Sequence, residues 1–191
     1  MVDGIFYASH FLSREFLEEL RVPAVTMNNE FSGLPVIHSD DVQGGYMAAR
    51  HLIGKGCKRM VHISGQQDHL SADVRMTSFM KECERQGVAC KVYSASEQML
   101  WDMEYMPLIN RIFMENPDMD GIFASSDIIA AQCIQMAGTL GYRIPEDIKI
   151  VGYDDICLSR LLYPPLTTVH QDIKGLAKTA MDTVEKLIEG K

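Results

Sequence analysis

The chain has 191 residues, of which 47% are hydrophobic and 23% charged, and its formal net charge is −8. This composition is typical of a globular protein and excludes a disordered one, since enough apolar side chains are present to form a core. An acidic surface repels phosphate, so the chain is not expected to hold nucleic acid by itself, and no apolar run is long enough to span a bilayer.

The first third of the chain alternates short apolar runs with stretches of helical period. A helix is expected up to about Leu20, with Ser13 as a possible N-cap, and a second over 42–53, between Asp41 and the glycines Gly54 and Gly56. The strand-like runs are 4–8, 23–27, 35–37 and 60–63.

The rest of the chain continues the alternation. Helices are expected over 72–86, 102–114, 128–140 and 174–188, and strands over 88–93, 121–124, 148–153 and 167–170. The pattern predicts an α/β fold with parallel sheets flanked by helices and right-handed crossovers. In such sheets ligands bind beyond the carboxyl ends of the strands, so polar residues that follow strands are the candidate site residues.

Catalytic and metal-binding motifs find no support. The five cysteines are scattered without a C-x-x-C pair, the six histidines have no metal-binding spacing, and no G-x-S-x-G or Walker pattern is present. Close helix packing explains Gly44 and Gly45, between a strand and a helix, better than phosphate binding does. We therefore expect no catalytic residue, metal or cofactor.

Asp154 and Asp155 follow an apolar strand directly. Two carboxylates in that place can accept hydrogen bonds from ligand hydroxyls or serve as acid and base, but an Asp after a strand also caps a following turn or helix. Spacing alone favours capping. Asp40 and Asp41 pose the same choice, and there Asp41 is expected to cap the helix that starts after it.

Arg75 lies one helical turn after Ser71, near the start of a predicted helix. A guanidinium there can donate two hydrogen bonds to vicinal hydroxyls or to a carboxylate. Pairing with Asp73 or Glu82 on the surface is the alternative, and spacing does not decide between them.

Trp101, the single tryptophan, lies in a polar stretch before a predicted helix. Aromatic faces stack on sugar rings and on cations. A tryptophan in a loop more often fills part of the core.

A series of motifs is more specific than this periodicity, and it resembles the lac-repressor and purine-repressor family of bacterial transcription regulators. The resemblance covers nearly the whole chain in family order, although Cys57 stands where the family usually has His. The matching segments are 2–5, 39–53, 56–65, 123–130, the I-P-E-D-I-x-I-V-G-Y-D-D run at 144–155 and P-P-L-T-T-V-H-Q-D at 164–172.

The resemblance implies a two-lobed fold like that of periplasmic binding proteins, with an effector bound between the lobes. Residues 1–64 and 173–191 would form the N-terminal lobe and residues 65–172 the C-terminal lobe. The implied function is that of an allosteric regulator in the cytoplasm, whose small effector, a sugar, controls operator binding.

The family pattern also implies effector contacts by position. Trp101 would be the stacking aromatic, Asp154 the carboxylate that binds hydroxyls, and Gln171 would lie at the strand crossing between lobes. The remaining expected contacts are Ser9, His10, Ser71, Arg75, Ser126 and Asp127.

Two departures from the family pattern indicate a fragment. The helix-turn-helix headpiece and the strand-helix units that open the first lobe are missing, and the chain stops at Gly190 and Lys191 before the closing strands of the family. The first lobe is therefore expected to be truncated. Operator DNA would be bound only through the missing headpiece, by a full-length homodimer.

Two rival hypotheses remain at this point. An exported sugar-binding protein of a transport system would share the two lobes. A sugar-handling enzyme would use Asp154 with Asp155 or Asp40.

Overall fold

The computed structural model describes residues 2–8, 19, 22–27, 33–65 and 70–190, with the backbone alone described at 70–72. Contacts divide the chain into two compact units. The first comprises Met1–Asp40 with Asp172–Lys191, and the second comprises Asp41–Gln171.

The first unit contains a parallel sheet of three strands in the order β1-β2-β3 and one long helix. The strands are β1 (Ile5–Tyr7), β2 (Ala24–Met27) and β3 (Val36–Ile37), and the helix is α7 (Ile173–Ile188). Val25 on the middle strand packs with Ala180 and Val184 of α7 in a small apolar core. The helix predicted to end near Leu20, with its cap at Ser13, lies outside the described residues.

The second unit contains a five-stranded parallel sheet in the order β5-β4-β6-β7-β8. Its strands fall within a residue or two of the predicted runs. They are β4 (Arg59–Ser64), β5 (Ala89–Ser94), β6 (Gly121–Ala124), β7 (Lys149–Asp154) and β8 (Thr167–His170).

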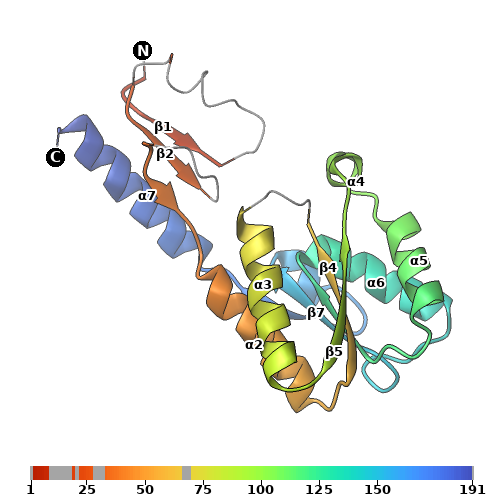
Figure 1. Cartoon of the computed structure of the whole chain (residues 1–191). Coiled ribbons are helices and arrows are strands. Elements are labelled where there is room, and N and C mark those ends of the chain that lie inside the picture. Colours follow the sequence, from red (N-terminus) through yellow and green to blue (C-terminus); the bar gives the residue numbers. More distant parts are fainter. Residues whose placement is uncertain (1, 9–18, 20–21, 28–32, 66–69, 191) are drawn as a thin grey trace. The chain divides into compact units, whose positions relative to one another are not determined.

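Helices cover both faces of this sheet, as Figure 1 shows. Because side chains alternate along a strand, Val61 and Ile63 of β4 pack in the core under α5 (Met106–Glu115) and α6 (Asp127–Thr139). Met60 packs in the opposite core, under α2 (Asp41–Gly54) and α3 (Leu70–Arg85). The α/β architecture with parallel sheets flanked by helices is confirmed.

The helix predicted over 102–114 is wrong at its beginning. Two helices occupy this stretch, α4 (Glu97–Asp102) and α5, and α4 ends where Met103 adopts a left-handed conformation with φ of 51°. α5 starts with a proline in its first turn, which tolerates a residue without an N–H. A short 3-10 helix, η1 (Cys157–Arg160), follows β7 and was not predicted.

The division into units differs from the one that the sequence suggests. Residues 41–64, expected in the first lobe, group with the second unit, because β4 hydrogen-bonds to both β5 and β6. At the other crossing the division falls between 171 and 172, one residue from the expected place.

The glycines at the start of α2 allow close helix packing, as the sequence suggests. A Cβ on Gly45 would collide with the backbone oxygen of Arg75 and with Oγ of Ser78, both on α3. A Cβ on Gly44 would lie 2.5 Å from the hydroxyl of Tyr153. α2 therefore lies against α3 and β7 more closely than any larger residue would permit.

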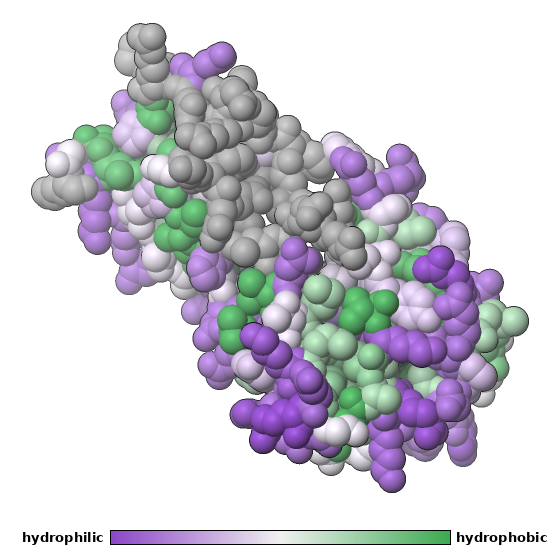
Figure 2. Space-filling view, viewed as in Figure 1, coloured by the Kyte–Doolittle hydropathy of each residue, from purple (hydrophilic) through white to green (hydrophobic). Residues whose placement is uncertain are grey.

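In the part of the chain that the structure describes, no helix has the length and apolar character needed to cross a membrane. Figure 2 shows hydrophilic side chains over much of the described surface on this face, with apolar groups between them.

Candidate functional site

Polar residues gather at the carboxyl edge of the five-stranded sheet. Because all five strands are parallel, their last residues lie along one edge. Ser125 and Ser126 follow β6, Asp154 ends β7, and Gln171 follows β8. The sequence-predicted residues Arg75, Ser126, Asp127, Asp154 and Gln171 all belong to this part of the second unit.

Arg75 is buried beside this edge and forms an ion pair with Asp41. Its Nε donates to Oδ1 of Asp41 at 2.6 Å, and its Nη1 donates to the backbone oxygen of Ser125 at 3.0 Å. The side chains of Arg75 and Asp41 are only 9% and 5% exposed. The alternative of a surface arginine paired with Asp73 or Glu82 is therefore wrong, and Glu82 pairs with Arg50 and Arg85 instead.

Tyr153 completes the support of the guanidinium. The Cζ atom of Arg75 lies 3.6 Å from the centroid of the Tyr153 ring, which is a close cation-π contact. The tyrosine hydroxyl donates to Oδ1 of Asp41 at 2.8 Å, so one carboxylate oxygen holds both residues. The position of the arginine is thus fixed by a charge, a ring face and a backbone carbonyl.

The prediction that Asp41 caps a helix is wrong. Asp41 is the first residue of α2, and its carboxylate is turned to Arg75 and Tyr153. Neither contact can be read from local spacing, since the partners are 34 and 112 residues away. One signal in the sequence could have indicated this pair. A buried arginine requires a carboxylate, and Asp41 is an acidic residue near the start of a helix, as Arg75 is.

Asp154 lies at the end of β7, where its backbone is strained and its side chain is partly buried. Its φ is 111°, a conformation that residues other than glycine rarely adopt and that is concentrated at functional sites. Burial raises its pKa to about 6, while the charge of Arg75 and a hydrogen bond from Gln171 act in the opposite direction. The Nε2 of Gln171 donates to Oδ1 of Asp154 at 2.6 Å.

Both Arg75 and Asp154 have a polar atom outside the hydrogen bonds described above. The hydrogen bonds of Arg75 to Asp41 and Ser125 use Nε and Nη1, and the bond from Gln171 uses Oδ1 of Asp154, so Nη2 and Oδ2 are not used in these contacts. The charge of Arg75 is close enough to lower the pKa of Asp154. A guanidinium and a carboxylate that interact electrostatically thus lie at the same sheet edge, and such a combination suits a molecule with several hydroxyls.

Asp127 and Ser126 serve the protein's own backbone and side chains. Oγ of Ser126 accepts from the N–H of Ile129 as the N-cap of α6. The carboxylate of Asp127 is fully buried and accepts from Thr168 at 2.6 Å and from the N–H of Ile156 at 2.9 Å. Burial raises the pKa of Asp127. These bonds tie α6 to β8 and to the segment after β7.

Asp155 is distinguished from Asp154 by its environment. It accepts from Nδ1 of His170 at 2.9 Å and from Oγ of Ser159 in η1 at 3.2 Å. The hydrogen bond from His170 is the main reason that its pKa is lowered. The two carboxylates therefore differ in their partners, since Asp155 is bound by His170 and Ser159 and Asp154 by Gln171.

Trp101 lies in α4, seven residues after the end of β5, and it is 56% exposed. The interpretation that it fills the core is wrong, because its neighbours Met99 and Leu100 pack against the core instead. The exposure of the indole agrees with the prediction of a stacking aromatic but does not test it.

Three predicted contacts are not placed by the structure. Ser9 and His10 lie outside the described residues, and the side chain of Ser71 is not described, although its backbone belongs to α3. No group of three or more His, Cys, Asp or Glu side chains that could hold a metal occurs within the described ranges.

Comparison with protein families gives a match to the model of a periplasmic binding protein-like domain over residues 49–191. Among curated proteins, the ribose operon repressor of Halalkalibacterium halodurans is 35% identical over 192 residues. The alignment covers 100% of this chain and 57% of the repressor, so the chain spans a little more than half of that relative.

Solved structures agree with this match. A periplasmic binding protein/LacI transcriptional regulator from Alkaliphilus metalliredigens QYMF, complexed with D-xylulofuranose, has a TM-score of 0.82 at 27% identity, and the match covers 100% of this chain and 71% of that one. The complex of the transcriptional regulator CelR with cellobiose has a TM-score of 0.87 at 25% identity, with 99% and 60% covered. The chain therefore belongs to the periplasmic-binding-protein-like domain family, in which its relatives are lac-repressor-type transcription regulators.

Proposed function

We propose that this chain is the effector-sensing core of a lac-repressor-type transcription regulator and that its effector is a small polyhydroxylated molecule, a sugar. The observation that carries the proposal is the pair formed by Arg75 and Asp154. The guanidinium is fixed by Asp41 and Tyr153, and its Nη2 and Oδ2 of Asp154 are not used in the contacts described above.

The chemistry of this pair favours a neutral polyol. A carboxylate accepts hydrogen bonds from hydroxyls and a guanidinium donates to their oxygens, so vicinal hydroxyls satisfy both at once. The relatives support the same class, because one solved regulator is complexed with D-xylulofuranose and another with cellobiose. Trp101 is exposed and can stack on a sugar ring.

The other predicted contacts are also part of the proposal, and some of them are supported by contacts in the structure while others are not. Gln171 orients Asp154, and Ser126 with Asp127 fixes the backbone after β6. Ser9, His10 and Ser71 are proposed as further contacts on the family pattern alone.

Regulation would follow from differential binding. An effector shifts the equilibrium between two states only by its difference in affinity for them, and a tenfold change in operator binding requires about 1.4 kcal/mol of coupling. Operator DNA would be bound by a helix-turn-helix headpiece of the full-length protein, in the cytoplasm. The acidic core has a net charge of −8 and does not suit DNA.

We further propose that the full-length regulator is a homodimer. Leu161 and Tyr163, in the segment after η1, are 78% and 94% exposed, which is unusual for large apolar side chains that lie so close together. Light scattering at increasing concentration tests this proposal, and a Tyr163→Ser variant that stays as dimeric as the wild type would place the interface elsewhere.

The rival hypotheses have less support. A relative that is aligned over the whole chain is named a ribose operon repressor, which favours a regulator over an exported binding protein and over a sugar-handling enzyme. We propose that the chain catalyses no turnover of its ligand.

A thermal-shift screen of pentoses, hexoses and disaccharides against the chain tests the proposed function, because a ligand that binds only the native state raises its melting temperature. A sugar that raises it should also change the fluorescence of Trp101, since no other tryptophan is present. A purine or an amino acid that stabilises the chain, with no effect from any sugar, would overturn the proposed ligand class.

A further inference from the structure

A pocket lies in the second unit at the opposite end of the strands from Asp154. It has a volume of about 340 Å³ and is lined by residues of α2, α6, β7 and β8. Lys149, the first residue of β7, is at this pocket, and Asp154 is the last residue of the same strand. Five strand steps of about 3.3 Å separate them by roughly 16 Å, so this pocket is distinct from the candidate effector site.

The pocket exists because β8 begins later than β7. Lys149 and Ile150 pair with β6, but the first residue of β7 that pairs with β8 is Val151, opposite Thr167. The residues before Thr167 are Pro164, Pro165 and Leu166, and they line the opening instead of extending the ladder. Proline cannot donate to a strand ladder, which explains why the pairing stops there.

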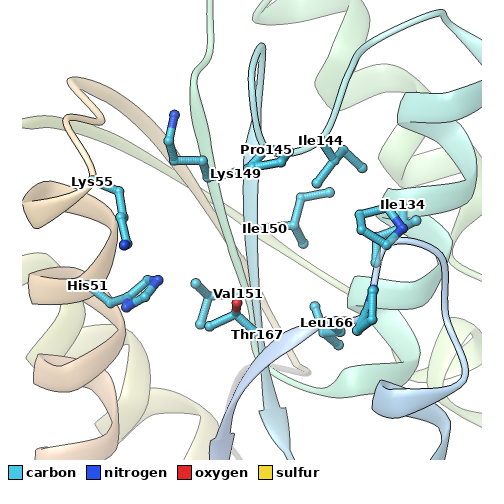
Figure 3. Close-up of a pocket in the computed structure, with 12 residues that line it drawn as sticks. His51, Lys55, Ile134, Ile144, Pro145, Lys149, Ile150, Val151, Leu166 and Thr167 are labelled. Carbon is cyan, nitrogen blue, oxygen red and sulfur yellow. The ribbon is translucent and has the colours of Figure 1, made fainter.

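One side of the pocket is cationic. Figure 3 shows Lys55 and His51 on α2 and Lys149 on β7 along this side. Within the described ranges, none of these three side chains forms a hydrogen bond or an ion pair with a carboxylate. Lys149 is only partly exposed, and a partly buried cation without a partner is costly unless something neutralises it.

Two acidic residues of the neighbouring segments, Asp120 and Asp147, are already engaged. Asp120 accepts from the backbone N–H groups of Lys58 and Arg59 at 2.9–3.0 Å. Asp147 pairs with Arg143. Glu146, in the same loop, is exposed to solvent. The positive side of the pocket is therefore left for a molecule from outside, in a protein whose net charge is otherwise −8.

The other side of the pocket is apolar. Figure 3 shows the aliphatic side chains of Ile134, Ile144, Ile150 and Leu166 there. A ligand that suits both sides carries an anionic group at one end and a hydrocarbon or aromatic body at the other. The volume is at the small end of the range for ligand pockets, which excludes a dinucleotide and fits a small acid.

We propose that this pocket binds a small organic anion, a carboxylate or phosphate with an apolar body, held by Lys55 and Lys149. The inference is independent of the proposed function, because it uses none of the residues assigned to the effector. A ligand here would contact the start of β7, the strand that ends in Asp154.

Backbone amide shifts of the ¹⁵N-labelled 191-residue chain test the proposal. Benzoate and phenyl phosphate are titrated to millimolar concentration beside neutral benzyl alcohol. We expect one of the anions to give saturable shifts at Lys149, Ile150 and Thr167, with an affinity at least tenfold above that of the alcohol. Absence of saturable shifts with both anions, or equal affinity for the alcohol, would overturn the proposal.

Matched variants distinguish anion binding by the pocket lysines from an effect of the net charge of the protein. Lys55→Met with Lys149→Met should weaken anion binding at least tenfold, and the corresponding double change to arginine should retain it. The control is Lys178→Met with Lys186→Met on α7, which removes the same charge from the first unit. Equal loss in the two methionine variants would mean that only the net charge matters, and the pocket assignment would fail.

Discussion

At the scale of single residues, the buried ion pair between Arg75 and Asp41 decides the chemistry of the site. Both side chains are nearly excluded from water, so each charge depends on the other. Arg75→Ala would leave the carboxylate of Asp41 buried without its cation. We predict that this variant lowers the free energy of unfolding by about 3–5 kcal/mol in urea denaturation.

The control for this prediction is an arginine pair on the surface. Arg143 pairs with Asp147 through a side chain that is 72% exposed, so Arg143→Ala should lower the free energy of unfolding much less than Arg75→Ala does. Similar losses in the two variants would show that the Arg75 pair is not buried in solution.

Asp154 gives a prediction with a defined sign. Burial raises its pKa to about 6, whereas an unfolded chain has an aspartate pKa of about 3.9. Between these values the native state binds more protons than the unfolded state, so this residue's contribution to stability falls as the pH rises from about 4 to 6. Asp154→Asn should therefore be more stable than the wild type at pH 7, by on the order of 1–3 kcal/mol, and this advantage should vanish below pH 4.

The neighbouring carboxylate provides the matched control. The hydrogen bond from His170 lowers the pKa of Asp155, so Asp155 stabilises the native state above its unfolded pKa. Asp155→Asn should thus be less stable than the wild type at pH 7, opposite in sign to Asp154→Asn. If both variants shift in the same direction in urea denaturation at pH 7, the assignment of different roles to the two residues is wrong.

At the scale of the elements, the close approach of α2 and α3 holds Arg75 against Asp41. Gly45→Ala would push its Cβ into the backbone of Arg75, and the two helices would have to move apart. We predict a loss of about 1–3 kcal/mol in urea denaturation, as for other overpacked cores.

A helical glycine in open space is the appropriate control for that change. A Cβ on Gly138 of α6 meets no atom within 4 Å, so Gly138→Ala should stabilise the chain by up to about 1 kcal/mol. A stabilising Gly45→Ala would mean that the helices do not pack as described.

The elements themselves could be predicted from the sequence where hydrophobic period and end signals agree. The strands over 121–124 and 167–170 occur with the predicted bounds, because apolar runs and turn residues mark both ends. The start of the helix predicted over 102–114 was misplaced by four residues, because the left-handed conformation at Met103 that ends α4 is not marked by any hydrophobic pattern.

The site could be predicted only in part, for a related reason. Motif position indicated Arg75, Asp154 and Gln171, and these residues lie at one sheet edge. Asp41 and Tyr153 were missed as the support of Arg75, because their contacts join segments far apart in the chain. The role of Asp41 as a cap was the natural local interpretation, and tertiary pairing overrode it.

At the scale of the whole molecule, charge and site together define what the chain is suited to do. A net charge of −8 disfavours DNA, and the polar groups at the carboxyl edge favour an uncharged ligand with several hydroxyls. Sensing and operator binding would therefore belong to different parts of the full-length regulator.

Isothermal titration of the chain with the sugar that gives the largest thermal shift tests this account most directly, in the wild type, Asp154→Asn and Asp155→Asn. We predict saturable binding to the wild type, at least tenfold weaker binding to Asp154→Asn in spite of its greater stability, and nearly unchanged binding to Asp155→Asn. Equal affinities for the wild type and Asp154→Asn would contradict the assignment of this edge as the effector site.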